Sequence, residues 1–206
     1  MAKIISTLFI SLDGVVEPDE NWHFPYFDEA MGAAVRDDYD TADTLLLGRV
    51  TYDSFVGAWP DREAAGGEDA AFAKTLGDMR KLVASRHPHD LGWRNVELID
   101  GDLVETARAL RGDSSVKGVL IPGSVSVVRQ LLAAGVIDEL RLLLHPVAAR
   151  HGLKLFDDGE PSYHLRLLRS ETFPTGVLRL IYAPTQTPGV VSYDDIKDQA
   201  PGREHA

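Results

Sequence analysis

The stretch that decides the fold is residues 43–52, which read DTLLLGRVTY. Residues 44–47 are a short apolar run, as expected of a buried strand, and a helix is expected to begin over residues 51–55. Gly48 between them lets the backbone approach a ligand closely, and the helix start offers free N–H groups. Arg49 and Thr51 add a guanidinium and a hydroxyl that suit a phosphate. The pattern predicts either a phosphate site or an ordinary strand-to-helix turn with a surface arginine.

Two further strand ends carry similar residues. Ser85 and Arg86 follow a strand expected at residues 81–84, and Pro122-Gly123-Ser124-Val125 follows one expected at 116–121. Taken singly, the first fits a solvated loop and the second a helix capped by Ser124. Neither the full dinucleotide glycine pattern nor the Walker pattern is present. Three such turns in one sheet, two of them with arginine, point jointly to a phosphorylated nucleotide.

The remaining patterns alternate between strands and helices. Strands are expected at residues 4–12, 44–47, 81–84, 96–99, 116–121, 140–147, 163–173 and 177–183, helices over 28–40, 51–55, 71–76, 102–110 and 125–134, and a loose loop at 64–71. The last two strands are joined by Pro174-Thr175-Gly176, which is typical of a hairpin. The order predicts an α/β fold with a mixed, mostly parallel sheet, helices on both faces and a C-terminal antiparallel hairpin.

Length and composition restrict the class of protein. The chain has 206 residues, a net charge of −11 and no cysteine. The acidic balance argues against nucleic acid and anionic membrane as partners, and no apolar run is long enough to span a membrane. The absence of cysteine excludes disulfides and fits a cytoplasmic location. We expect one domain over residues 1–184, followed by an extension or disordered tail at 185–206.

Several motifs together resemble a known family. They are Ser11-Leu12-Asp13-Gly14, DTLLLGRVTY with Trp59-Pro60 after it, KLVASR at 81–86, GVIDEL at 135–140 and His145-Pro146. In this order they resemble the dihydrofolate reductase superfamily, and within it the C-terminal reductase domain of the bifunctional riboflavin-biosynthesis deaminase-reductase. The resemblance spans residues 3–184 and implies the dihydrofolate-reductase-like fold.

The resemblance also implies an NADPH site formed by three turns and one loop. Its residues would be Gly48, Arg49 and Thr51 at the phosphates, Ser85 and Arg86 at the adenosine end with its 2′-phosphate, Gly123, Ser124 and Val125 along the pyrophosphate and nicotinamide, and Asp13 and Gly14 in the loop over the nicotinamide. The implied activity is hydride transfer from NADPH to a small heteroaromatic or carbonyl substrate, as in 5-amino-6-(5-phosphoribosylamino)uracil reduction in riboflavin biosynthesis. The deaminase motifs are absent, which leaves open a stand-alone reductase with its own substrate.

Two alternatives remain at this stage. A dihydrofolate reductase needs a buried acid beside the pterin, and Asp28 is the one catalytic candidate, although it lies one residue too far from Trp22. A solvated or capping acid at a helix start is the favoured interpretation of Asp28, and we expect it to be at least partly exposed. The other alternative is a non-catalytic nucleotide-binding module.

No metal is expected, since the histidines at 87 and 89 lack a third ligand. We expect a homodimer, because such domains commonly pair and the segments 140–147 and 163–183 offer a sheet edge.

Overall fold

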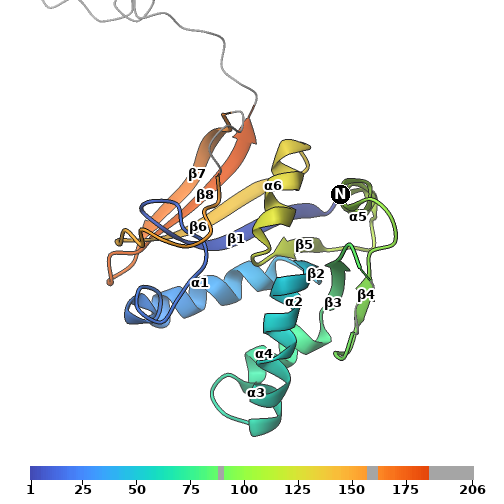
Figure 1. Ribbon diagram of the computed structural model, residues 1–206, viewed down its shortest axis with the longest axis horizontal. Coiled ribbons are helices and arrows are strands. Elements are labelled where there is room, and N and C mark those ends of the chain that lie inside the picture. The colour runs from blue at the N-terminus through green and yellow to red at the C-terminus, as the bar shows by residue number, and fades with distance from the viewer. Residues whose placement is uncertain (88–90, 157–161, 186–206) are drawn as a thin grey trace, which may run out of the picture.

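The computed structural model describes residues 1–87, 91–156 and 162–185 (Figure 1). The described residues contain one eight-stranded sheet. Its strands are β1 (Lys3–Ser11), β2 (Thr44–Gly48), β3 (Arg80–Ala84), β4 (Val96–Leu98), β5 (Gly118–Ile121), β6 (Glu139–His145), β7 (His164–Thr172) and β8 (Leu178–Thr185).

The helices connect these strands. They are η1 (Phe24–Tyr26), α1 (Glu29–Asp40), α2 (Arg49–Val56), α3 (Trp59–Ala65), α4 (Ala70–Asp78), α5 (Leu103–Gly112) and α6 (Val125–Ala133). The expected loop at 64–71 was wrong in part. Helix α3 runs to Ala65 and α4 begins at Ala70. Gly66, with φ +72°, ends α3 in the left-handed conformation that glycine adopts without steric cost.

The strand order is β4-β3-β2-β5-β1-β6-β8-β7. All neighbours pair in parallel except β6 with β8 and β8 with β7, which are antiparallel. The expected α/β class, with a mostly parallel sheet and a C-terminal hairpin, is confirmed. The expected tail at 185–206 begins one residue too early, because Thr185 ends β8; residues 186–206 lie outside the described part.

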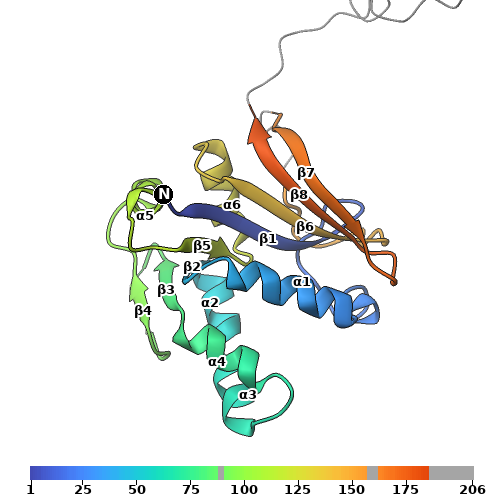
Figure 2. The same ribbon diagram turned by 180° about the vertical axis from the view of Figure 1, so that it is seen from behind.

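Helices cover both faces of the sheet. Helices α5 and α6 pack on one face, where Ala107 and Leu131 join the apolar side chains of the central strands. Helices α1, α2 and α4 pack on the other face through Tyr39, Tyr52 and Leu76. Figure 1 shows α6 on one side, and Figure 2 shows α1 on the opposite side. Within the described ranges, no helix is long and apolar enough to cross a membrane.

The centre of the sheet opens because β5 is short. Strand β5 pairs with β1 from Lys3 to Ser6, and with β2 only at Thr44 and Leu45. Beyond these residues β1 continues to Ser11 beside β6 alone. The sheet therefore separates between β1 and β2 at the carboxyl ends of its strands, which is where open α/β sheets bind ligands.

A buried ion-pair network fixes α1 against the other side of this opening. Asp38 of α1 is 1% exposed and accepts hydrogen bonds from Arg141 of β6 at 2.8 Å and from Arg179 of β8 at 2.5 Å. The hydroxyl of Thr7 on β1 donates to the same carboxylate at 2.7 Å. A buried carboxylate needs such partners, because taking an unpaired charge out of water is costly. Four elements thus hold one wall of the opening rigidly.

Candidate active site

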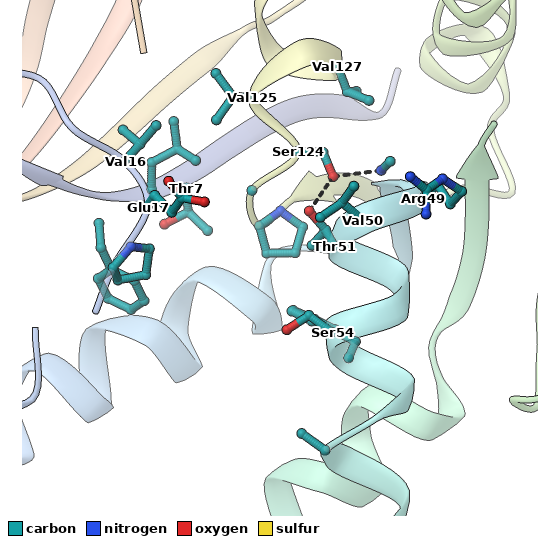
Figure 3. Close-up of a pocket in the computed structure, with 18 of the residues that line it drawn as sticks. Thr7, Val16, Glu17, Arg49, Val50, Thr51, Ser54, Ser124, Val125 and Val127 are labelled. Atoms are coloured by element: carbon teal, nitrogen blue, oxygen red, sulfur yellow. Dashed lines mark hydrogen bonds between the residues drawn. The ribbon is translucent and has the colours of Figure 1, made fainter. Parts of the chain in front are cut away.

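A cleft with a volume of about 1630 Å³ occupies the opening in the sheet. Thr7 and Phe9 of β1 and the turns after β2, β3 and β5 line it. Figure 3 shows the centre of this cleft, with the start of α2 opposite the loop that carries Val16 and Glu17. Pockets for drug-sized ligands are typically about 300–1,000 Å³. The cleft is therefore large enough for a dinucleotide together with a second small molecule.

The turn after β2 places its predicted residues on the cleft. Gly48, Arg49 and Thr51 all line it, at the first turn of α2. The Arg49 guanidinium donates to Asp53 one turn later at 2.9 Å, so its charge is partly balanced within the helix. A Cβ at Gly48 would make a tight contact, 3.1 Å from the Ser124 side chain.

Ser124 joins this turn to the one after β5. Its hydroxyl accepts from the Gly48 N–H at 2.6 Å and donates to the Thr51 hydroxyl at 2.7 Å (Figure 3). Ser124 is the N-cap residue of α6, as one interpretation of the turn expected, but its hydroxyl makes no cap hydrogen bond to the helix. Gly123 and Ser124 have φ of +125° and +60°, so the chain turns sharply before α6. These two residues and Val125 line the cleft.

The turn after β3 also lies on the cleft. The Ser85 hydroxyl is used within the turn, where it donates to the His87 carbonyl at 2.8 Å. Arg86 is exposed and lines the cleft, and no ion pair holds its guanidinium within the described part of the chain. Arg86 is thus available to an anionic ligand, whereas Ser85 already has a partner.

Asp13 and Gly14 lie in the loop that follows β1. Neither is among the described residues that line the cleft; Val16 and Glu17 of the same loop do so instead. The Asp13 carboxylate accepts from the backbone N–H groups of Ala149 and Arg150 at 2.9 and 2.7 Å. The Ser11 hydroxyl, together with these backbone donors, lowers the pKa of Asp13 to about 2. Asp13 therefore anchors one loop to another.

Asp28 caps a helix. Its side chain accepts from the Met31 N–H at 2.8 Å at the start of α1, and it is half-buried. It is not among the described residues that line the cleft. The expectation of a partly exposed capping acid is confirmed. Asp38, a buried acid on the same helix, already accepts hydrogen bonds from two arginines and Thr7.

A pair of buried histidines beside the cleft was missed. His23 lines the cleft, and its Nδ1 lies 3.2 Å from Nε2 of His145, the last residue of β6. Both are under 10% exposed. Burial, and next the neighbouring His145, lowers the pKa of His23 to about 4, and burial also lowers the pKa of His145. The dense aromatic sequence from Trp22 to Phe27 was the available signal for a functional loop.

Aromatic rings surround His23. The ring of Phe9 lies 4.2 Å from the imidazole, and the rings of Phe24 and Phe27 lie 5.2 and 5.6 Å away, measured between centroids. Phe24 and Phe27 are 63% and 46% exposed and line the cleft. This end of the cleft is therefore apolar and suits a flat ring, in contrast to the end with Arg49 and Arg86. In the part of the chain that the structure describes, no three metal-binding side chains come close enough together to hold a metal ion.

Comparisons with known proteins place the chain in a family. The RibD C-terminal domain family matches residues 2–179. The uncharacterized protein YyaP of Bacillus subtilis is 27% identical over 183 residues, covering 87% of this chain and 94% of its own. Among solved structures, a pyrimidine reductase-like protein of Corynebacterium diphtheriae is 17% identical with a TM-score of 0.63, covering 90% of this chain and 93% of that chain. RibD of Acinetobacter baumannii is 15% identical with a TM-score of 0.64, covering 90% of this chain and 58% of that chain.

Proposed function

Since this chain belongs to the RibD C-terminal domain family, we propose that it is an NADPH-dependent reductase of the riboflavin-biosynthesis type, acting on 5-amino-6-(5-phosphoribosylamino)uracil or a closely similar ring. The observation that carries the proposal is one cleft with two unlike ends. Turns with glycine and arginine border one end, and aromatic rings border the other. NADPH supplies the hydride, and the chain supplies binding and orientation.

The residues present fit the cofactor. Gly48 and Gly123 line the cleft without a side chain, and residues of the first turns of α2 and α6 line it as well. Helix starts and close backbone N–H groups favour phosphate groups. Arg86 is the cation for the 2′-phosphate that distinguishes NADPH from NADH, because its guanidinium has no competing carboxylate in the described structure.

The opposite end offers a separate cation for the substrate. Arg36 of α1 lines the cleft, is exposed, and makes no ion pair with any described residue. Its Nη1 lies beside Gly32 and Phe27: a Cβ at Gly32 would be 3.4 Å from it. A phosphoribosyl substituent on a ring bound among the phenylalanines would place its phosphate within the reach of such a guanidinium. The position of Asp28 outside the cleft lining disfavours the dihydrofolate reductase alternative.

The proposal is tested by binding and turnover together. The wild-type protein should bind NADPH more tightly than NADH and oxidise it only when the substrate is added, followed by the loss of nicotinamide absorbance. Arg86→Ala should weaken NADPH binding about 10- to 150-fold and leave NADH binding nearly unchanged, since a charge-assisted contact contributes about 1.5–3 kcal/mol. Arg108→Ala, at an exposed α5 residue paired with Glu105, is the matched control. Equal affinity of the wild type for both cofactors would contradict the proposal, and NADPH binding without turnover would favour the non-catalytic module.

A homodimer and a cytoplasmic location remain part of the proposal. The edge strand β7 supports the homodimer, since Leu167 and Leu168 on it are 49% and 44% exposed. An exposed edge with apolar side chains is a ready surface for pairing with a second copy.

A further inference from the structure

The hydrogen bonds around His145 fix the proton positions on two imidazoles. Nδ1 of His145 lies 2.9 Å from the backbone carbonyl of Leu143. A carbonyl oxygen only accepts hydrogen bonds, so Nδ1 of His145 carries the proton. In the neutral ring, Nε2 of His145 is then an acceptor with a lone pair. The atom that faces it at 3.2 Å, Nδ1 of His23, must therefore be the donor.

With the proton of the neutral His23 ring on Nδ1, the other ring nitrogen, Nε2, carries no proton. Burial holds the pKa of His23 at about 4, so the ring is neutral at physiological pH. Nε2 of His23 makes no hydrogen bond to any residue in the described ranges. It is absent from the buried polar atoms that lack a partner in these ranges, so it is open to solvent. Since His23 lines the cleft, the open side of this nitrogen is the cleft itself.

The surroundings define what such an acceptor can bind. The rings of Phe9, Phe24 and Phe27 surround the imidazole and favour a flat apolar body. A neutral imidazole nitrogen accepts from an N–H but offers no negative charge to a protonated ring. The carboxylate of Asp38, which could do so, is occupied by Arg141 and Arg179.

We propose that His145 locks His23 in the Nδ1–H tautomer, so that Nε2 of His23 accepts a hydrogen bond from a ring N–H of a planar, uncharged substrate. His23 is then the substrate-binding residue and His145 a positioning residue. The substrate class is a lactam-type heterocycle such as a uracil ring, rather than a cationic pterin. The choice of a uracil rests on the proposed function, but the tautomer of His23 does not.

The tautomer is tested on the full-length protein by nitrogen NMR of the histidine rings. Protonated and bare ring nitrogens give well-separated signals. The signals of His23 and His145 are identified among those of the seven histidines with the His23→Gln and His145→Gln variants. We expect the Nδ1–H form for both His23 and His145. His145→Leu should release His23 into a mixture of tautomers, while His145→Gln, whose side-chain oxygen can still accept, should keep the Nδ1–H form. A His23 signal with the proton on Nε2 in the wild type overturns the proposal.

Ring recognition is tested with 6-aminouracil and its two ring-N-methyl analogues, by calorimetry in the presence of NADPH. Methylation of the nitrogen that donates to His23 should weaken binding about 5- to 100-fold, because it removes the donor and leaves the acceptor unpaired. His23→Phe should bind the parent and this methylated ring alike. Arg108→Ala should retain the wild-type discrimination. Equal binding of all three rings by the wild type, or binding of none, overturns the proposal.

Turnover distinguishes this proposal from the one on which it rests. Substrate-dependent NADPH oxidation without discrimination between the rings overturns the role of His23 and leaves the reductase function standing. Discrimination between the rings without NADPH oxidation supports the role of His23 and contradicts the reductase function.

Discussion

The stability of the fold toward acid should depend on His23. The pKa of His23 lies at about 4 in the folded chain because of burial and the neighbouring His145, against an ordinary value of 6.5 in the unfolded chain. Between these two pH values the unfolded chain binds a proton that the folded chain excludes. The stability that is present above pH 6.5 is therefore lost progressively as the pH falls toward 4.

The size of this loss follows from the same two pKa values. The difference between 6.5 and about 4, multiplied by about 1.36 kcal/mol, gives an upper value of about 3.4 kcal/mol. At about pH 5, where the folded chain still excludes the proton, the linkage relation gives a loss of about 2 kcal/mol from this one group. Because His23 also lines the open cleft, solvent screening reduces this figure, and about 2 kcal/mol is its upper value.

The measurement is urea unfolding at about pH 7.5 and about pH 5 for the wild type, His23→Gln and His151→Gln. The carboxylates contribute equally to all three proteins, so the difference in pH sensitivity reports on His23 together with its contact to His145. His23→Gln should lose up to about 2 kcal/mol less on acidification than the wild type. His151→Gln changes an exposed histidine and should behave as the wild type does. The reasoning is refuted if the wild type and His23→Gln lose the same stability between the two pH values.

Three further predictions concern other parts of the molecule. Asp28→Asn should leave the NADPH affinity unchanged within about 2-fold and preserve the stability, since asparagine caps a helix as well as aspartate does. Asp28→Ala should lower the free energy of unfolding by about 1 kcal/mol, measured by thermal or urea unfolding. Antifolates should bind weakly, and tight binding in calorimetry would contradict the assignment of Asp28 as a helix cap. Lys81→Met should lower the free energy of unfolding in urea by about 2–3 kcal/mol, because the buried ammonium donates to the carbonyls of Leu76, Gly77 and Met79 at the end of α4. An unchanged urea midpoint would argue against this role of Lys81. Light scattering should give twice the chain mass of 22.6 kDa, and Leu167→Lys on the β7 edge should shift the protein toward the monomer; a wild-type monomer at micromolar concentration would contradict the dimer.

The features that the sequence predicted well are local ones. The turn at Gly48 can be predicted from the sequence, because an apolar run, a glycine and the start of a helix follow one another within a few residues. Helix α3 was missed although it has a local signal, since Pro60 stands in its first turn and Gly66 ends it. The alanine- and glycine-rich composition of 64–71 outweighed that signal in the prediction.

The features that escaped prediction depend on residues far apart in the chain. The partners in the histidine pair are separated by 122 positions, and the bond from the Gly48 N–H to Ser124 spans 76. No period or spacing in a single sequence reports such contacts, because they arise only when the strands take their places in the sheet. Asp13 shows the same limit: its motif is recognisable, but its bonds to Ala149 and Arg150 depend on a loop that only the folded chain brings near.

The charge on the cleft explains how an acidic protein could hold an anionic cofactor. The whole chain carries 21 basic and 32 acidic residues, yet the charged residues on the cleft are balanced, with four arginines and four acids: Arg36, Arg49, Arg62, Arg86, Glu17, Glu68, Asp69 and Asp102. Arg49 pairs with Asp53 and Arg62 lies 3.6 Å from Asp69, so these two charges are partly satisfied by the protein itself. Arg36 and Arg86 are left for ligands, one on α1 beside the phenylalanines and one after β3. The neutral imidazole of His23 also lines the cleft, which suits a neutral ring that carries phosphate groups. The negative charge of the rest of the chain would disfavour anions bound elsewhere on the surface.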